Sequence, residues 1–401
     1  MSRRAKPPRR RVVILGGTGA MGRITARDMV RTGRGAIDVV VADRDVSAVR
    51  IPGVETVAVD VCDPASLARA LDGAFATIAS LPYRLNLAAM HGALAAGVHY
   101  VDLGGLFHVT RRQLELHHAF AERGVMAILG VGSAPGILNV MAVQCAQGMD
   151  TVREVHCLVG AADRTRFRET PLLPFGYSVD TLLDEYVMPS AVFRGGAFAM
   201  VPALDPGERV PVRFPAPVGR IHVDSTLHSE VATLPLSFAD RGIREVTFRQ
   251  GFDPGFMERL RFLVQLGLAD TNPLPLANGN GVSPRAMLLA LVGRRPQTRP
   301  IGKPWRYEVL RTVVRGRRGG RAVTVTADCH AGPDAGFGVG PDIDTGAPPS
   351  IAVQLMAGGE IPIRPGVWPV EQVIPPAPFI RELKRRGMRV TQRTRPGRAP
   401  L

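Results

Sequence analysis

Glycines whose spacing suits a phosphate site follow a short apolar run near the start of the chain, in the segment VVILGGTGAMG at 12–22. Gly17, Gly19 and Gly22 have the G-x-G-x-x-G spacing directly after an expected strand and at the start of an expected helix. We expect Gly17 to allow a tight turn, Gly19 to let the main chain approach a pyrophosphate, and Gly22 to let the helix pack closely on the strand. The N–H groups of the helix N-terminus would then face the phosphates. The pattern predicts a dinucleotide site formed by Gly17, Thr18, Gly19, Ala20, Met21 and Gly22.

An acidic residue stands where a ribose-binding carboxylate is needed. Asp43, in VVVADRD, lies 21 residues after Gly22 and ends the next expected strand, so its carboxylate is placed to accept the ribose hydroxyls. That carboxylate would repel the 2′-phosphate of NADP, whereas the adjacent Arg44 would accommodate it. We therefore expect NAD as the cofactor, with NADP as the alternative; a turn residue without a ligand is the other interpretation of Asp43. Further cofactor contacts are expected after the third and fourth strands, at Asp60, Val61, Ser80, Leu81 and Pro82.

The elements that position these residues alternate between strand and helix over the first third of the chain. Strands are expected at 12–15, 38–42, 55–59, 75–80, 99–102 and 125–129, with helices at 19–31, 65–71, 85–96 and 111–123. Several of these strands are continuous apolar runs, which is typical of a parallel sheet with helices on both faces. The sequence predicts an α/β fold with a doubly wound parallel sheet.

The pattern changes after about residue 134. A helix is expected at 136–148, followed by alternating segments such as TVREVHCLV, RVPVRF, GRIHVDSTLHSEVATL and REVTFRQGF. These are typical of antiparallel strands with one solvated face, and residues 305–329 are typical of a hairpin. We therefore predict a second, α+β domain. Two late helices, at 349–357 and 376–386, fit either domain.

Composition excludes several classes of protein. Residues 1–11 hold six basic residues, and 381–401 hold eight against one acidic residue, so most of the net charge of +15 lies at the two ends. With 5% aromatic residues and no aromatic-basic interleaving, we expect no dedicated nucleic-acid binding. The four cysteines and the scattered histidines show no metal-ligand spacing, so we expect no metal and a reducing compartment. No apolar run spans a membrane, and we expect a cytoplasmic protein.

The ordered set GGTGAMG, ADRD, SLPYRLN, GVHYVDLGG, GVGSAPGILNVMA, HSEVATLP and DTGAPPSIAVQLMAGGEI resembles the saccharopine dehydrogenase family, and within it the shorter members similar to lysine 6-dehydrogenase. The resemblance covers about residues 12–388. It implies a Rossmann-type dinucleotide-binding domain at 12–134, an inserted α+β substrate and dimerisation domain at 135–346, and a segment at 347–388 that returns to the first domain. Basic tails at 1–11 and 389–401 flank them. A homodimer is implied.

Such enzymes oxidise a C–N bond of an amino acid: hydride passes to the nicotinamide and water hydrolyses the resulting imine. Some members run in the opposite direction. The amine must lose a proton before it donates hydride, so a base or an ordered water is needed. The resemblance places Tyr83 near the substrate, and Asp102, at the end of the fifth strand, would hold the amine or a water. A core aromatic and a loop-capping carboxylate are the respective alternatives.

The second part of the chain is expected to supply further contacts. Strand alternation would put His228 and Glu230 on one face, where His228 would join the catalytic group and Glu230 would contact the substrate. Tyr177 and Ser178 are further expected contacts, and Arg285 would bind a carboxylate with its guanidinium. The glutamate-forming reductase of the family has a carboxylate where His117 and His118 stand here, so that assignment does not carry over. A non-catalytic dinucleotide sensor or scaffold, or a reductase of another substrate class, stays open.

Overall fold

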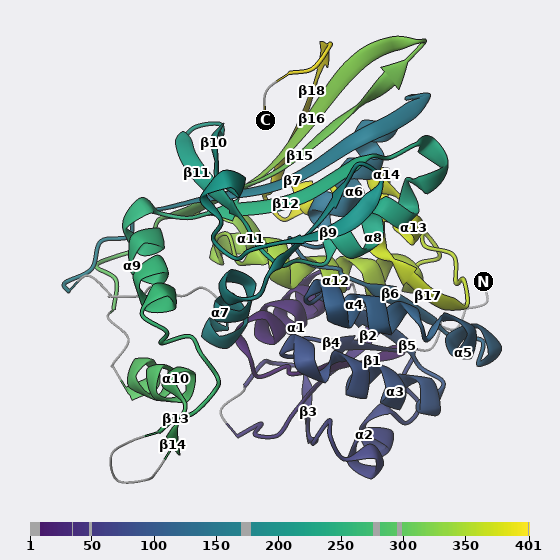
Figure 1. Ribbon diagram of the computed structural model, residues 1–401. Helices are drawn as coiled ribbons and strands as arrows, with labels where there is room; N and C mark the ends of the chain where they lie inside the picture. Colours follow the sequence, from purple (N-terminus) through teal and green to yellow (C-terminus); the bar gives the residue numbers. More distant parts are fainter. Residues whose placement is uncertain are drawn as a thin grey trace.

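The computed structural model describes residues 9–33, 35–47, 50–169, 178–275, 281–294, 299–399 and 401. Figure 1 shows a smaller sheet below and a larger, strongly twisted sheet above, with a layer of helices between them. Further helices cover the outer face of the smaller sheet.

The smaller sheet is entirely parallel and has seven strands in the order β17-β6-β5-β4-β1-β2-β3. Its apolar strands are buried between helices, so the predicted doubly wound sheet is confirmed. The seventh strand, β17, comes from the C-terminal part of the chain and was not predicted. The strands are β1 (Arg10–Leu15), β2 (Ile37–Asp43), β3 (Glu55–Ala58), β4 (Ala76–Ala79), β5 (His99–Asp102), β6 (Met126–Leu129) and β17 (Gly366–Pro369).

The crossover helices follow the predicted order, with one difference. The helix expected at 111–123 is two helices, because the chain bends between Leu114 and His117. The elements are α1 (Ala20–Thr32), α2 (Pro64–Leu71), the short η1 (Tyr83–Leu85), α3 (Asn86–Ala96), α4 (Phe107–Leu114) and α5 (His117–Glu122).

The larger sheet has nine strands, with the central order β10-β11-β12-β7-β15-β16-β18 and with β8 and β9 joined to β12. It is mixed rather than wholly antiparallel as expected, because β12 pairs with β7 in the parallel direction. The predicted hairpin is confirmed as β15 and β16. The strands are β7 (Thr151–Asp163), β8 (Ser190–Arg194), β9 (Ala197–Val201), β10 (Val210–Arg213), β11 (Arg220–Ser225), β12 (Glu245–Gly251), β15 (Arg306–Arg318), β16 (Arg321–Ala331) and β18 (Arg389–Pro396).

Helices of the second half fall into two groups. One group packs between the sheets: α6 (Ile137–Ala146), α8 (Glu230–Ser237), α11 (Ala335–Gly338), α12 (Ile343–Ala357), α13 (Val370–Val373) and α14 (Pro376–Arg385). The other group has a separate apolar core beside the sheets: α7 (Val179–Val187), α9 (Pro254–Gln265) and α10 (Pro284–Arg294), with the small strands β13 (Leu274–Pro275) and β14 (Gly281–Val282) nearby. Single turns η2 (Pro206–Glu208) and η3 (Ala239–Arg241) complete the described elements.

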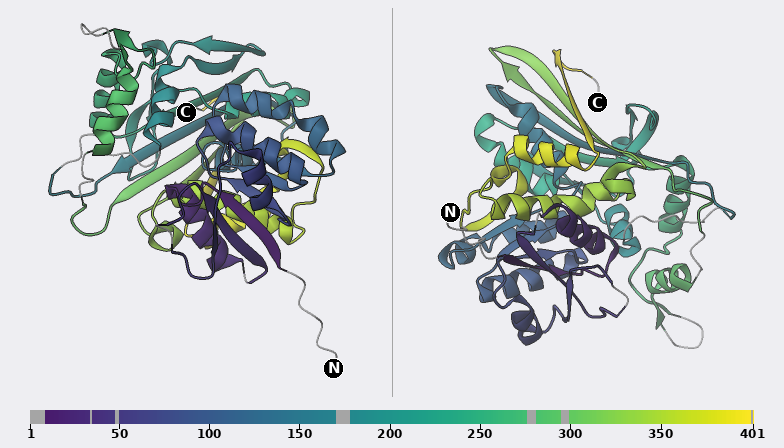
Figure 2. Two further views of the ribbon diagram at one scale, coloured as in Figure 1. Left: turned by 90° about the horizontal axis from the view of Figure 1, so that it is seen from below. Right: turned by 180° about the vertical axis from the view of Figure 1, so that it is seen from behind.

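The C-terminal segment packs against the first domain. Helix α12 runs along α1, where the Thr25 hydroxyl donates to the carbonyl of Gly346 at 2.7 Å. A Cβ at Gly346 would lie 2.5 Å from Ile24 Cγ2, so only glycine allows this approach. The right-hand view in Figure 2, from behind, shows α12 and α14 between the two sheets.

The prediction that one strand continues through the segment HSEV is wrong. Strand β11 ends at Ser225 and helix α8 begins at Glu230, so His228 lies in the connection and Glu230 opens a helix. The buried residues Leu227, Val231 and Leu234 are spaced four and three apart, which is the period of a helix face.

Both ends of the chain are more ordered than the predicted basic tails. Strand β1 already begins at Arg10, and Arg11 pairs with Glu55 at 2.9 Å. Residues 389–396 form β18, which pairs antiparallel with β16 at the edge of the larger sheet. Basic residues are common on edge strands because they discourage pairing with other chains. Within the described residues, no helix combines the length and apolarity that a bilayer crossing requires.

Candidate active site

The glycine turn lies against the end of β4. Gly16 has φ +71°, and a Cβ there would lie 2.2 Å from the carbonyl oxygen of Ser80. Gly16, which the motif analysis left out, therefore makes the tight turn expected of Gly17. A Cβ at Gly22 would lie 2.3 Å from the Gly16 oxygen, which confirms the close helix-strand packing expected there.

The N-terminus of α1 is open. Gly19 and Ala20 are exposed, no side chain caps the helix, and its first turn holds no acidic residue. Uncapped N–H groups and the helix dipole suit an anionic ligand.

Asp43 faces this turn from the end of β2. Its Oδ2 accepts hydrogen bonds from the Thr18 hydroxyl at 2.6 Å and the Thr18 amide at 3.2 Å, and its Oδ1 accepts from the Arg44 amide at 2.8 Å. The Arg44 side chain is exposed. The carboxylate thus stands beside the glycine turn, as ribose recognition requires.

The other expected cofactor contacts differ in their surroundings. The Asp60 carboxylate accepts from the Cys62 amide at 2.9 Å, and Val61 is buried. Ser80 Oγ, at the end of β4, is buried and has no hydrogen-bond partner within the described residues. An unpartnered buried hydroxyl next to an open helix N-terminus fits a bound dinucleotide, which supplies acceptors for both.

Tyr83 reaches across to the second half of the chain. Its hydroxyl donates to Asp184 Oδ2 of α7 at 2.7 Å, and its ring packs edge-on against His108 with centroids 5.9 Å apart. Burial and the Asp184 carboxylate raise the pKa of Tyr83. The phenol is thus a hydrogen-bond donor to Asp184, an arrangement that suits a positioning group better than a base.

Asp184 is 1% exposed and, besides its contact with Tyr83, forms ion pairs with two guanidinium groups. Arg84 and Arg285 both donate to it, and both also pair with Asp180, at 2.6 and 3.3 Å. Arg285 donates further to the Ala269 carbonyl at 2.7 Å and is buried, so it holds protein groups rather than a substrate carboxylate. The exposed Arg84 is better placed for that purpose. Ser178 caps α7 by accepting from the Thr181 amide, and Tyr177 lies outside the described residues.

Asp102 is fully buried and anchors two loops. Its Oδ1 accepts from the amides of Gly104 and Gly130 at 2.9 and 2.7 Å, and its Oδ2 accepts from Gln113 at 2.7 Å and Tyr100 at 3.2 Å. With its oxygens engaged in this way, the geometry supports the loop-capping interpretation over contact with a substrate.

His228 and Glu230 do meet, although at the start of α8 rather than on a strand. His228 Nδ1 and Glu230 Oε2 are 2.5 Å apart, and the imidazole stacks on Phe248 at 4.0 Å between centroids. Burial lowers the pKa of His228, but the Glu230 carboxylate outweighs burial and the net pKa is raised. His228 Nε2 has no hydrogen-bond partner in the described part of the chain, so this dyad presents a titratable nitrogen held in one orientation.

Unpartnered polar atoms gather around this dyad. We call the following residues the 225–230 polar cluster, because each has a buried oxygen without a hydrogen bond inside the described ranges: Ser225, Thr226, Ser229 and, through Oε1, Glu230. Each such group costs about 1–3 kcal/mol if it stays unpaired. Their concentration within six residues indicates a place that a polar ligand or water fills.

The cluster adjoins the Tyr83 group through α7. The carbonyl of Glu185, the residue after Asp184, accepts from the Leu227 amide at 3.3 Å, and Gln250 donates to the Glu185 carboxylate at 2.7 Å. Helix α4, which carries His108, packs against α8. Side chains of both halves of the chain therefore converge beyond the end of β4.

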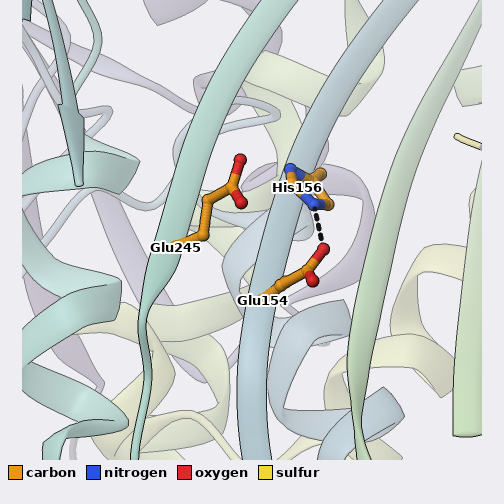
Figure 3. A group of neighbouring side chains, drawn as sticks. All are labelled: Glu154, His156 and Glu245. Carbon is orange, nitrogen blue, oxygen red and sulfur yellow. Dashed lines mark hydrogen bonds and ion pairs between the residues drawn. The ribbon is translucent and has the colours of Figure 1, made fainter. Parts of the chain in front are cut away.

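Among the described residues, one group of possible metal ligands lies away from this site, on β7 and β12. Figure 3 shows Glu154, His156 and Glu245 together. Arg315 donates to Glu154 at 2.5 Å and lies 3.3 Å from His156 Nε2. Because the Glu154 carboxylate already pairs with Arg315 and with His156 Nε2, 3.2 Å away, the group is better described as an ion-pair network than as a metal site.

Several residues of the site were not predicted: Gly16, Arg84, His108, Asp184, Ser225, Thr226 and Ser229. The signal for Asp184 was present, since two acidic residues interrupt the apolar run LLDEYV. The polar cluster had no local signal, because serine and threonine are ordinary in any connection.

An open parallel sheet with a glycine turn, a ribose-side carboxylate and a second domain over the strand ends defines a dinucleotide-dependent enzyme class. The family models agree: residues 12–128 match the saccharopine dehydrogenase NADP binding domain, and residues 132–388 match the saccharopine dehydrogenase C-terminal domain. The chain belongs to the saccharopine dehydrogenase family, whose members are NAD(P)-dependent oxidoreductases or related synthases. Its first domain is an NAD(P)-binding domain.

Two relatives extend the comparison. The chain is 24% identical over 326 residues to carboxynorspermidine synthase of Vibrio cholerae, covering 77% of this chain and 74% of that protein. The fold is similar to apo saccharopine dehydrogenase (L-Glu forming) from Saccharomyces cerevisiae, with TM-score 0.72 and 17% identity, covering 96% of this chain and 99% of that chain.

Proposed function

We propose that this protein is an NAD(P)-dependent oxidoreductase acting on the C–N bond of an amino acid or a polyamine-like amino acid. The observation that carries the proposal is the 225–230 polar cluster with its unpartnered oxygens. The Leu227–Glu185 hydrogen bond joins this cluster to the helix whose Asp184 contacts Tyr83. The similarity to carboxynorspermidine synthase supports a substrate with several amine groups.

The site residues divide the work by their chemistry. Glu230 Oε1 is free to accept a hydrogen bond from an ammonium group, and the half-exposed guanidinium of Arg84 is able to bind a carboxylate. The nicotinamide, when bound, accepts or donates hydride at the carbon that bears the nitrogen. His228, held by Glu230, takes the proton that the amine must lose.

Asp43 favours NAD over NADP in this proposal, because its carboxylate stands where a 2′-phosphate would be repelled. The Thr18 hydrogen bonds hold the carboxylate beside the glycine turn.

The direct test is a screen of lysine, saccharopine, other diamino acids and polyamines with NAD and with NADP, followed by absorbance of the reduced nicotinamide. We expect turnover with at least one amine, and a loss of at least about 100-fold in kcat for His228→Asn, as for removal of a general base. The matched control is His222→Asn, an exposed histidine on β11, which should keep full activity.

Cofactor binding without turnover of any amine would favour the alternative of a dinucleotide sensor or scaffold. Equal loss in the His228 and His222 variants would remove His228 from the proposed reaction.

A further inference from the structure

Two carboxyl groups, one buried and one half-buried, lie where the larger sheet meets the C-terminal return. Glu308 of β15 and Asp344 of α12 are hydrogen-bond partners, which requires a proton on one of them. Asp344 is 2% exposed, and its Oδ2 receives no hydrogen bond from a donor group in the described ranges. Burial and the nearby Asp342 charge raise the pKa of Glu308 to about 7, although its hydrogen bond with Asp344 lowers it. Burial and the contact with Glu308 raise the pKa of Asp344 well above its usual range.

Neighbouring charges do not neutralise this pair. Arg306 is committed to Asp342, with its two terminal nitrogens 3.0 and 2.7 Å from the two carboxylate oxygens. Arg306 therefore balances the negative charge of Asp342. The thiol of Cys329 on β16, near the carboxyl pair, stays neutral because burial raises its pKa. The remaining negative charge between Glu308 and Asp344 is relieved by a shared proton.

Two hydroxyl groups lead from this pair to the loop after β6. Thr345 Oγ1 donates to Asp344 Oδ1 at 3.2 Å, and Thr345 Oγ1 lies 2.9 Å from Ser133 Oγ. Ser133 stands in the segment that leaves β6 at the carboxyl edge of the parallel sheet, where ligands of this fold bind. Glu308, at the other end of the chain of groups, is only half-buried.

We propose that Ser133, Thr345, Asp344 and Glu308 form a proton relay between the ligand side of the loop after β6 and solvent. The proposal rests on the proposed function, because oxidation of an amine followed by imine hydrolysis must remove one proton from nitrogen and then one from the attacking water. His228 serves the first, and the relay serves the second.

The relay step balances without a further reactant. Water forms a C–O bond to the carbon of the protonated imine, the C=N π bond breaks with its electron pair going to nitrogen, and one O–H bond of the water breaks. That proton passes to Ser133 Oγ, the Ser133 proton passes to Thr345, and the Thr345 proton passes to Asp344. The carboxyl pair, which held one proton, now holds two, and Glu308 releases one to solvent.

The test compares Thr345→Val, which keeps the shape but removes the hydroxyl, with Thr345→Ser, which restores the hydroxyl. The control is Ser350→Ala, since Ser350 is a buried hydroxyl on the same helix that accepts from Gln354 at 2.9 Å. We expect Thr345→Val to lower kcat at least about tenfold, with unchanged cofactor affinity, while Thr345→Ser and Ser350→Ala stay near wild type. Equal rates for Thr345→Val and Ser350→Ala would overturn the relay.

A second readout needs no cofactor. The infrared difference between the unliganded wild type and Asp344→Asn near neutral pH should contain the band of a protonated carboxyl group, and a difference without this band would overturn the proposal. If the wild type turned over no amine at all, the proposed function would fail, and this infrared difference would still decide whether the pair holds the proton that the relay requires.

Discussion

The proposed cofactor choice depends on Asp43, and the proposed proton transfer depends on His228 and Glu230. Asp43 could be placed from the sequence, because spacing along one strand-turn-helix unit fixes it relative to Gly22. The contact of His228 with Glu230 was expected for the wrong reason: strand alternation predicted a shared face, whereas the two side chains meet across the start of α8. Asp184 contacts Tyr83 across 101 positions of sequence, and no local pattern reports such a contact.

Asp43→Ala tests cofactor choice at this scale. Loss of charged hydrogen bonds to the ribose should cost about 1.5–3 kcal/mol of NAD binding, whereas NADP should lose less because a repulsive carboxylate disappears as well. Calorimetric titration with both cofactors measures the difference. Asp45→Ala is the control, since that side chain lies in the same loop and its carboxylate accepts from the Ser47 amide at 2.8 Å. An equal loss for NAD and NADP would contradict the ribose role.

Glu230→Gln tests the dyad through pH. The neutral form of His228 is the base, so activity should fall as the pH drops through the raised pKa of His228. Removal of the Glu230 charge takes away the group that stabilises the imidazolium, so the acidic limb of kcat should move to lower pH. If the acidic limb of the kcat profile did not shift in Glu230→Gln, a group other than His228 would control it.

At the scale of elements, periodicity predicted the strands and helices of the parallel sheet closely, because apolar runs and crossover helices are local features. The larger sheet was less predictable. Its parallel pairing of β12 with β7 and the recruitment of residues 389–396 as β18 depend on where distant strands lie. The contact between η1 and α7 is of the same kind, and it joins the two halves of the site.

Asp184→Ala should break that contact. It leaves Tyr83 and two guanidinium groups without their buried partner, and loss of one partner of a buried ion pair costs about 3–5 kcal/mol. Urea unfolding measures this loss. Asp180→Ala, which removes a carboxylate 36% exposed that pairs with the same arginines, should cost no more than about 1 kcal/mol. Similar losses of stability for both variants would contradict the role of Asp184 as the buried partner that joins η1 to α7.

At the scale of the whole molecule, the C-terminal segment ties the two sheets into one structure. Arg386, after α14, donates to both carboxylate oxygens of Asp28 on α1 at 2.7 and 2.8 Å, and both side chains are buried. The parallel sheet gains β17 from the same segment. The two family models, which cover residues 12–128 and 132–388, therefore correspond to parts that are interleaved in space.

Arg386→Ala should destabilise the folded protein by about 3–5 kcal/mol, because the Asp28 charge stays buried without its partner. Arg385→Ala removes an exposed neighbour that pairs with Glu382 and should cost no more than about 1 kcal/mol. The comparison is made by urea unfolding, and an Arg386 variant as stable as the Arg385 variant would contradict the proposed tie.

In the proposed reaction, hydride leaves the carbon bonded to the amine nitrogen. The most direct measurement uses an accepted amine substrate carrying deuterium on that carbon, with mass spectrometry of the nicotinamide cofactor after turnover. We expect one deuterium on the reduced nicotinamide, with the label absent when Glu230→Gln and His228→Asn are combined. Reduced cofactor without the label would contradict the proposed reaction.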